Sequence, residues 1–149
     1  DLIIGIESSG LHSNGYSLIN EMLWRHKIAY LDMPELSTPT RIYASVVKEL
    51  INEVPILGMA HITGGGIVEN LPRCIPDGLK ANVNYDSWPL PDIFKKIMFA
   101  GEIPPEEMKR VFNLGIGYCI VIPKEAERDA HDTIDAFGYK SWTIGEVVL

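Results

Sequence analysis

Short apolar runs that are typical of strands alternate along this chain with amphipathic runs that are typical of helices. Five runs predict strands, over residues 2–6, 57–63, 79–85, 117–122 and 141–148. Six runs predict helices, over residues 16–26, 38–54, 67–71, 91–100, 105–112 and 126–137. The predicted order of elements is therefore β-α-α-β-α-β-α-α-β-α-β.

This order predicts an α/β chain of the α+β type, in which helices cover one β-sheet. Residues 79–85 alternate apolar with polar side chains, which indicates a strand with one more open face. We therefore expect a mixed sheet rather than a purely parallel one. A length of 149 residues fits one domain over residues 1–149. Because the chain enters its first strand directly after Asp1, we expect it to be a fragment of a longer protein.

The clearest amphipathic pattern spans residues 38–54. Thr38 is expected to cap this helix, Pro39 to occupy its first position and Pro55 to end it. Arg41 then lies near the helix N-terminus, where the helix dipole disfavours a cation. Either a bound anion or a carboxylate side chain of the protein would relieve that conflict.

Charge and composition argue against several classes of function. The chain has 13 Lys and Arg against 20 Asp and Glu, a net charge of −7, which disfavours a broad nucleic-acid or anionic-membrane surface. No apolar run approaches about 18 residues and no leader-like segment occurs, so we expect a cytoplasmic protein. We interpret Cys74 and Cys119 as buried thiols of a reducing compartment. No His, Cys, Asp or Glu pair has the spacing of a protein-only metal site.

Residues 8–17 join a predicted strand to a predicted helix and read Ser-Ser-Gly-Leu-His-Ser-Asn-Gly-Tyr-Ser. Small residues let the backbone approach a ligand, and the first turn of a helix offers unpaired N–H donors, so phosphate is the natural ligand. The stretch lacks the Lys-Ser/Thr pair of a P-loop and the Gly-x-Ser-x-Gly of a hydrolase elbow. The alternative is a capped turn, with Ser13 or Asn14 as the N-cap and Gly10 and Gly15 at positive φ.

Two further glycine-rich stretches flank predicted strands. A triplet of glycines, residues 64–66, follows Thr63 and indicates backbone held close to a ligand or to another chain segment. Residues 113–117, Asn-Leu-Gly-Ile-Gly, are the other candidate, with a helix C-cap followed by a bulge as the alternative. Glu69 and Asn70 either face the same pocket as the triplet or lie on a solvated helix face.

The four histidines are distinguished by their positions. His12 lies in the first glycine-rich stretch and is a better candidate for chemistry than a core histidine. A neutral imidazole there would accept a proton or donate one, with a structural hydrogen bond as the alternative. His61 falls in an apolar strand, and we interpret it as a core histidine. His26 and His131 are interpreted as helix-surface residues.

Four stretches together resemble the phosphoribosylformylglycinamidine cyclo-ligase family, also called aminoimidazole ribonucleotide synthetases. They read SSGLHSNGYSL, TPTRIY, AHITGGG followed by ENLPR, and FNLGIG, and they occur in order and at matching spacing along residues 1–148. Leu11 and Leu114 stand where that family is expected to have Pro and Met, and both are apolar replacements. The resemblance is to the C-terminal domain of the family alone.

The resemblance implies an ATP-dependent ring closure in purine biosynthesis, in which formylglycinamidine ribonucleotide becomes aminoimidazole ribonucleotide. It also implies a mixed sheet covered by helices, partly ferredoxin-like. Much of the ATP and magnesium site and the interface of a homodimer would lie in an N-terminal domain that is absent here. We therefore expect this fragment alone to be largely monomeric and inactive.

The resemblance, together with the loop position, assigns His12 as the catalytic residue. Substrate or phosphate would be bound by Ser9, Gly10, Ser13, Asn14, Gly15, Thr40, Arg41, Thr63, Gly64, Gly65, Gly66 and Asn113. One alternative is a non-catalytic phosphate-ligand-binding or interaction domain on the same scaffold. Another is a relative that handles selenophosphate or thiamine phosphate, against which the run His12–Tyr16 speaks.

Overall fold

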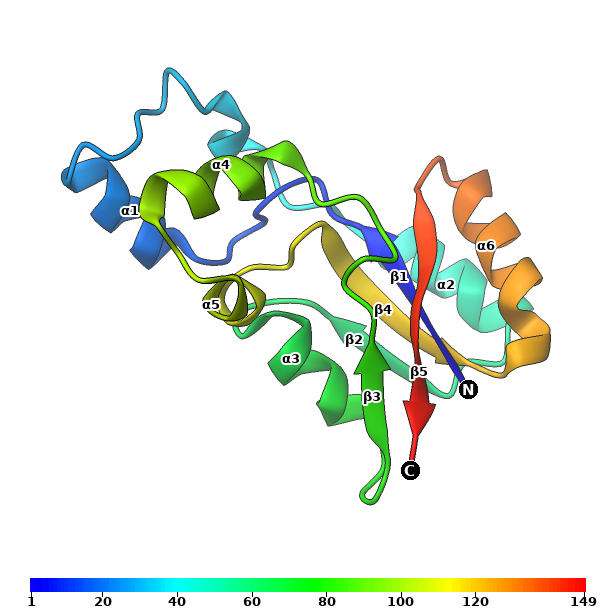
Figure 1. Ribbon diagram of the computed structural model, residues 1–149. Coiled ribbons are helices and arrows are strands. Elements are labelled where there is room, and N and C mark those ends of the chain that lie inside the picture. Colours follow the sequence, from blue (N-terminus) through cyan, green and yellow to red (C-terminus); the bar gives the residue numbers. More distant parts are fainter.

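The computed structural model describes residues 1–149 and contains one five-stranded sheet with helices around it (Figure 1). The strands are β1 (Leu2–Glu7), β2 (Gly58–His61), β3 (Lys80–Val83), β4 (Ile116–Ile122) and β5 (Ser141–Val148). The helices are α1 (Tyr16–Trp24), α2 (Ala44–Glu53), α3 (Gly66–Asn70), α4 (Asp92–Gly101), α5 (Pro105–Val111) and α6 (Glu127–Ala136). Short 3₁₀ turns are η1 (Pro34–Ser37), η2 (Leu71–Cys74) and η3 (Lys124–Ala126). The α+β class and the order of strands and α-helices predicted from the sequence are confirmed.

The sheet has the order β2-β4-β1-β5-β3, and all four neighbouring pairs run antiparallel. The expectation of a mixed sheet is therefore wrong. Strands that follow one another along the chain are never neighbours in this sheet, so the intervening helices do not impose parallel pairing. Because of this antiparallel order, the carboxyl ends of β1 and β2 lie beside the amino end of β4.

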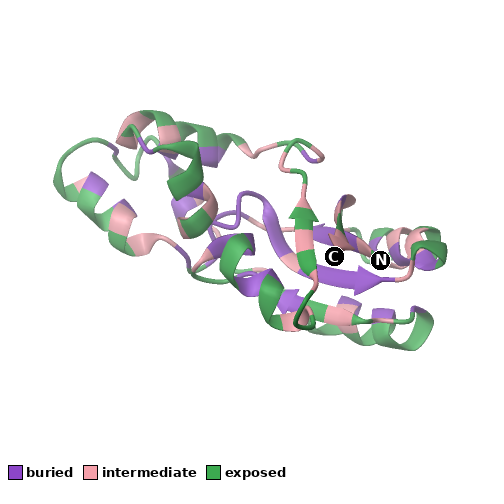
Figure 2. Cartoon of the chain, turned by 60° about the horizontal axis from the view of Figure 1, so that its bottom comes forward, coloured by how far each residue is buried: buried purple, intermediate pink, exposed green.

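Two buried clusters cover the two faces of the sheet. On one face, Ile4 and Ile6 of β1 pack with residues of α2 and α6, which lie side by side in Figure 1. On the other face, Ile3 packs with Ile67 of α3 and with Trp88. Burial is accordingly highest in β1 and β4 (Figure 2).

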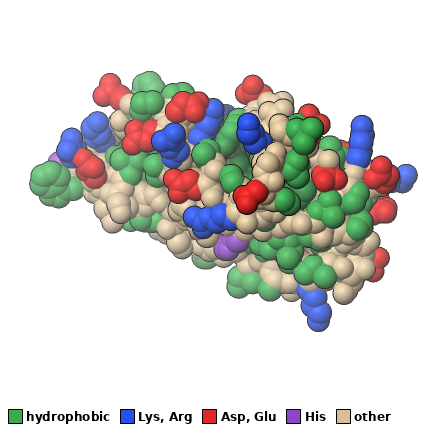
Figure 3. Space-filling model, turned by 90° about the horizontal axis from the view of Figure 1, so that it is seen from below, with side chains coloured by type: hydrophobic (Ala, Val, Ile, Leu, Met, Phe, Trp, Pro, Cys, Tyr) green, Lys and Arg blue, Asp and Glu red, His purple; other side chains and the backbone are tan.

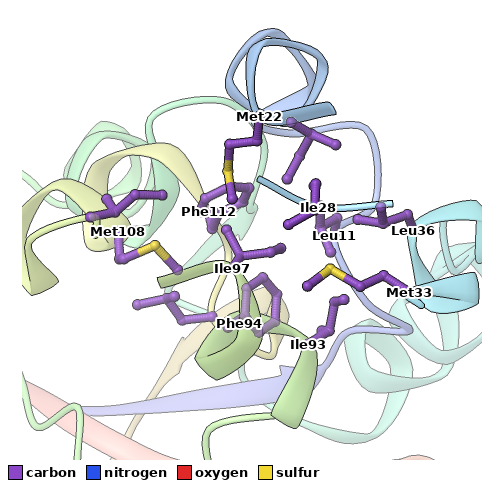
Figure 4. Close-up of a cluster of buried hydrophobic side chains, with 13 residues drawn as sticks. Leu11, Met22, Ile28, Met33, Leu36, Ile93, Phe94, Ile97, Met108 and Phe112 are labelled. Carbon is purple, nitrogen blue, oxygen red and sulfur yellow. The ribbon is translucent and has the colours of Figure 1, made fainter. Parts of the chain in front are cut away.

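A third cluster of 13 buried apolar residues lies beyond one end of the sheet (Figure 4). It is built mainly from α1, α4, α5 and the segment 28–36. Leu11, Phe112 and Leu114 insert into it from the stretches before and after these helices. The cluster therefore anchors two of the glycine-rich stretches at the end of the sheet.

The second helix begins later than the sequence pattern indicates. α2 starts at Ala44 rather than Thr38, and Thr38 instead ends the turn η1. Residues 38–43 are not helical, because they are held against the stretch after β1: the Pro39 carbonyl accepts a hydrogen bond from Ser9 Oγ at 2.7 Å. The predicted cap at Thr38 and the helical position of Pro39 are therefore wrong. α1 also ends two residues early, at Trp24.

Several features bear on the membrane, metal-binding and nucleic-acid functions that the sequence argues against. No helix in the structure has the length and apolar character that a bilayer crossing requires. No three His, Cys, Asp or Glu side chains gather where they could hold a metal ion. Cys119 is buried and Cys74 half-buried, and both are free thiols. Acidic and basic side chains are interspersed on the face seen in Figure 3.

The third cluster generates a stability prediction with a matched control on the same helix. Phe94 is 0% exposed and lies 5.9 Å from the ring of Phe112, whereas Phe99 is 88% exposed. Phe94→Ala should lower the free energy of unfolding by about 3–5 kcal/mol, because it leaves a cavity. Phe99→Ala should change it by about 0.5 kcal/mol or less. Urea denaturation of both variants measures the difference, and equal losses would contradict the assigned packing.

Candidate active site

Three glycine-rich loops meet at one end of the sheet. We call residues 8–15 the first loop, residues 62–66 the second loop and residues 113–115 the third loop. The first follows β1, the second follows β2 and the third precedes β4. Direct contacts join them: Asn14 Nδ2 donates to the Ile62 carbonyl at 3.4 Å, Ser8 N–H donates to the Gly115 carbonyl at 2.8 Å, and Asn113 adds further bonds. The structure thus brings together stretches that are about 50 residues apart in the sequence.

Asn113 braces the first loop against the third. Its side chain is 0% exposed, and its Nδ2 donates to the Gly10 carbonyl at 2.8 Å. Its Oδ1 accepts from the Gly115 N–H at 2.8 Å and from Ser8 Oγ at 3.0 Å. The C-cap of α5 is Phe112, and a register irregularity lies across from Ile116. Asn113 therefore has a structural role, and its contact with a ligand stays a prediction.

Asn70 organises the second loop. Its Nδ2 lies 3.3, 3.1 and 2.8 Å from the carbonyl oxygens of Thr63, Gly64 and Gly66, and its Oδ1 accepts from Thr63 Oγ1 at 3.1 Å. Asn70 is buried, whereas Glu69 is exposed. Of the two residues after the triplet, only Asn70 therefore belongs to the loop structure. The sequence signal for it was its position four residues after Gly66.

The three glycines of the second loop have different reasons to be glycine. A Cβ on Gly66 would lie 2.1 Å from the Lys109 carbonyl of α5, so this residue serves contact with another chain segment. Gly65 has φ +95°, and its Cβ would lie 2.3 Å from Glu69 Oε2. A Cβ on Gly64 would meet nothing within 4 Å. Gly64 alone thus faces open space where a ligand can approach the backbone.

The first loop enters α1 without a side-chain cap. Gly15 is the N-cap residue, at φ 76°, so the alternative with Ser13 or Asn14 as the cap is wrong. A Cβ at Gly15 would lie 2.2 Å from the Phe112 ring, which explains why the cap is a glycine. Asn14 is buried and holds the second loop instead, while Ser13 is exposed and contacts Thr40 Oγ1 at 3.3 Å.

His12 is the buried centre of the first loop. It is 5% exposed and has a positive φ of 56°. Its Nε2 accepts a hydrogen bond from the Ser9 N–H at 3.1 Å, and its Nδ1 is buried with no partner. A buried polar atom without a partner costs about 1–3 kcal/mol, so Nδ1 is the position of this ring that still lacks a hydrogen bond. Burial, followed by the charges of His61 and Arg41, lowers the pKa of His12 to about 4.

Arg41 is paired with a carboxylate of the protein. Its Nη1 lies 2.8 Å from Glu7 Oε1, and its guanidinium carbon lies 4.5 Å from the centre of the Tyr139 ring. Of the two partners considered from the sequence, the structure contains the carboxylate. Because α2 begins at Ala44, Arg41 also lies outside that helix and meets no dipole there. Binding of a ligand by Arg41 or by the exposed Thr40 beside it stays a prediction.

Aromatic side chains line the surface next to His12. Tyr43 donates from Oη to the Glu7 carbonyl at 2.7 Å, and its ring lies 6.0 Å from that of His12. Burial raises the pKa of Tyr43. His61 stacks on Tyr118 at 5.9 Å and is exposed, so its interpretation as a core histidine is wrong. β2 is an edge strand of the sheet, and an apolar sequence run does not show which strand lies at an edge.

The chain matches the family model described as AIR synthase related protein, C-terminal domain, over residues 1–148. The chain belongs to this family. Its sequence is 46% identical to the phosphoribosylformylglycinamidine cyclo-ligase of Carboxydothermus hydrogenoformans and 45% identical to that of a Synechococcus strain, CC9902. It is 41% identical to that of Bacillus subtilis. These alignments cover 98–99% of this chain but only 45–46% of each relative, so the chain spans about half their length. The resemblance inferred from the four stretches is confirmed.

In this AIR synthase related domain, Ser13, Thr63 and Gly64 are the exposed residues of the three loops, and the third loop is buried. Backbone N–H groups of Gly10, Ser13, Gly15 and Gly64 donate to no group within the protein. A cavity of about 340 Å³ is lined by Ser8 and Gly115, at the edge of the first and third loops, whereas residues 9–15 and 62–66 line neither this cavity nor the one of about 500 Å³ between α3 and β3. The domain thus offers a set of free donors beside a buried histidine.

The bracing role of Asn113 can be tested by stability. Asn113→Ala leaves the buried Gly10 carbonyl and Gly115 N–H without their partner, so the free energy of unfolding should fall by about 2–4 kcal/mol. Asn82→Ala, at an exposed strand position, is the matched control and should change it by about 0.5 kcal/mol or less. Urea denaturation gives both values. A loss at Asn113 no larger than at Asn82 would rule out the bracing role.

Proposed function

We propose that this chain is the C-terminal half of an ATP-dependent cyclo-ligase that closes the imidazole ring of aminoimidazole ribonucleotide from formylglycinamidine ribonucleotide. The observation that carries the proposal is the convergence of the three loops at one end of the sheet, with His12 in the first loop and unused N–H donors at Gly10, Ser13, Gly15 and Gly64. The relatives that match 98–99% of the chain carry the name of this activity. The place of the reaction is de novo purine biosynthesis in the cytoplasm.

The proposed reaction needs donors aimed at oxygen. ATP phosphorylates the amide oxygen of the substrate, a nitrogen of the amidine attacks the activated carbon, and phosphate leaves as the ring closes. Negative charge lies on phosphoryl oxygens throughout, and fixed N–H donors stabilise such charge without having to reorganise. The free N–H groups of the first and second loops and the Nδ1 of His12 supply donors of this kind. Arg41 is paired with Glu7 and holds the end of β1 in place, and its contact with a ligand stays a prediction.

The rest of the active site belongs to the other half of the enzyme. The loops carry no cluster of carboxylates that could hold Mg²⁺. ATP with its magnesium would therefore be bound mainly by an N-terminal domain, which would also form the homodimer. A chain that supplies one wall of a site should not turn over substrate by itself.

The proposal is tested by joining this chain to the N-terminal part of the Carboxydothermus enzyme, in place of the matching part of that relative. The joined protein should form aminoimidazole ribonucleotide from ATP and formylglycinamidine ribonucleotide, and residues 1–149 alone should not. His12→Ala in the joined protein should lower kcat by roughly 10²–10³-fold with an unchanged circular dichroism spectrum, the range for loss of one fixed donor. A folded joined protein that binds both substrates without turnover would favour the non-catalytic binding domain instead.

A substitution at Gly64 is predicted to weaken substrate binding without affecting the stability of the fold. Gly64→Ala adds a methyl group where nothing lies within 4 Å, so the melting temperature should hold while substrate affinity falls about tenfold, or about 1.4 kcal/mol. Gly65→Ala is the contrasting variant, because φ +95° and Glu69 oppose its Cβ, and it should lower the melting temperature. Thermal melting and steady-state kinetics on the joined protein measure both. Unchanged affinity in Gly64→Ala would remove the second loop from the ligand site.

A further inference from the structure

The hydrogen bond between Ser9 and His12 fixes which ring nitrogen carries the proton. A backbone N–H can only donate, so Nε2 of His12, 3.1 Å from the Ser9 nitrogen, must be unprotonated. In a neutral imidazole the single proton then resides on Nδ1. Nδ1 is the atom that has no partner within the protein. The free position on this ring is therefore a donor, and the acceptor position is already used.

The surroundings of His12 keep the ring neutral. The groups that face it are Arg41 from the segment before α2, His61 at the end of β2 and Tyr43 at the start of α2. Glu7 is turned toward Arg41 at 2.8 Å, so its charge is compensated. A second proton on Nε2 would also break the bond from Ser9. Protonation is thus opposed by burial, by two neighbouring basic groups and by a hydrogen bond.

We infer that His12 acts as a neutral hydrogen-bond donor through Nδ1 toward an oxygen atom of the ligand, a phosphoryl or amide oxygen, and does not act as a base. The identity of the reaction rests on the proposed function, whereas the tautomer does not. Nδ1 is buried in this structure, so the inference requires the first loop to shift before an acceptor reaches it. That loop is held to residues 39–40 by two exposed hydroxyl contacts, Ser9 Oγ to the Pro39 carbonyl and Ser13 Oγ to Thr40 Oγ1.

His131 in α6 provides an internal control with the opposite tautomer. Its ring is half-buried and lies between Ser141 Oγ at 2.7 Å from Nδ1 and Thr143 Oγ1 at 3.1 Å from Nε2. The carboxylate of Glu127 only accepts, so Thr143 donates its proton to it at 2.6 Å. Thr143 then accepts from Nε2–H, and Nδ1 accepts from Ser141. The structure thus predicts Nδ1–H at His12 and Nε2–H at His131.

The first test uses residues 1–149 labelled with ¹⁵N-histidine and measures which ring nitrogen is protonated by two- and three-bond ¹H–¹⁵N couplings. His12 should show the Nδ1–H form at pH 7, and the neutral ring of His131 should show the Nε2–H form, with His12→Asn and His131→Asn assigning the signals. An Nε2–H form at His12, or an imidazolium at pH 6, would overturn the inference. This measurement does not depend on turnover, so its outcome tests the tautomer of His12 separately from the proposed function.

The second test compares two amide replacements in the joined protein. His12→Asn places an amide near the former Nδ1 position and should keep kcat within about tenfold. His12→Gln reaches the Nε2 position instead and should lose roughly 10²–10³-fold. The pH dependence of kcat is compared between the unsubstituted joined protein and His12→Asn. An ionisation near the ordinary histidine pKa of 6.5 should not distinguish the two proteins. Equal losses in both variants, or such an ionisation, would contradict the donor role, and the ionisation would identify His12 as a base. Absence of all activity in a folded joined protein would count against the proposed function alone.

Discussion

The buried side chain of Asn113 is the interaction on which the arrangement of the site depends. One amide joins the first loop, through Gly10 and Ser8, to the turn at Gly115. Leu114, between these residues, has a positive φ of 53° and accepts a hydrogen bond from the buried indole of Trp88 at 2.9 Å. The third loop is thus held from both sides, and the first loop is held to it. His12 owes its fixed place to this brace, since its own ring makes only the bond to Ser9.

The order of strands explains why the three loops meet at all. β1 is central, with β4 on one side and β5 on the other, and β2 lies beyond β4. Antiparallel pairing places the end of β1, the end of β2 and the start of β4 together. The apolar cluster beyond that end then anchors the loops through Leu11 and Phe112. The catalytic assignment therefore depends on contacts between residues far apart in the sequence, which the sheet creates.

Local patterns predicted the elements well, because the spacing of apolar residues and the Gly and Pro residues at element ends are properties of short stretches of sequence. The run at 91–100 and the Gly at its end predicted α4 almost to its observed bounds, Asp92–Gly101. The predicted start of α2 at Thr38 was wrong because Thr38 followed by Pro39 is equally compatible with a turn. The hydrogen bond from Ser9, 30 residues upstream of Pro39, holds this segment out of the helix. The interpretation of His61 as a core residue was wrong because an apolar run does not show that its strand, β2, lies at the edge of the sheet. Among the glycines of the triplet, only the tertiary neighbours distinguish Gly66, packed on α5, from Gly64, which faces open space.

The central claim is that the first and second loops form the ligand-facing wall of this AIR synthase related domain. The most direct measurement is backbone hydrogen exchange at short labelling times on the joined protein, with and without formylglycinamidine ribonucleotide and a non-hydrolysable ATP analogue. Residues 8–15 and 62–66 should become protected on ligand addition, because their free N–H groups gain acceptors. Protection confined to the cavity between α3 and β3, with both loops exchanging as before, would contradict the account.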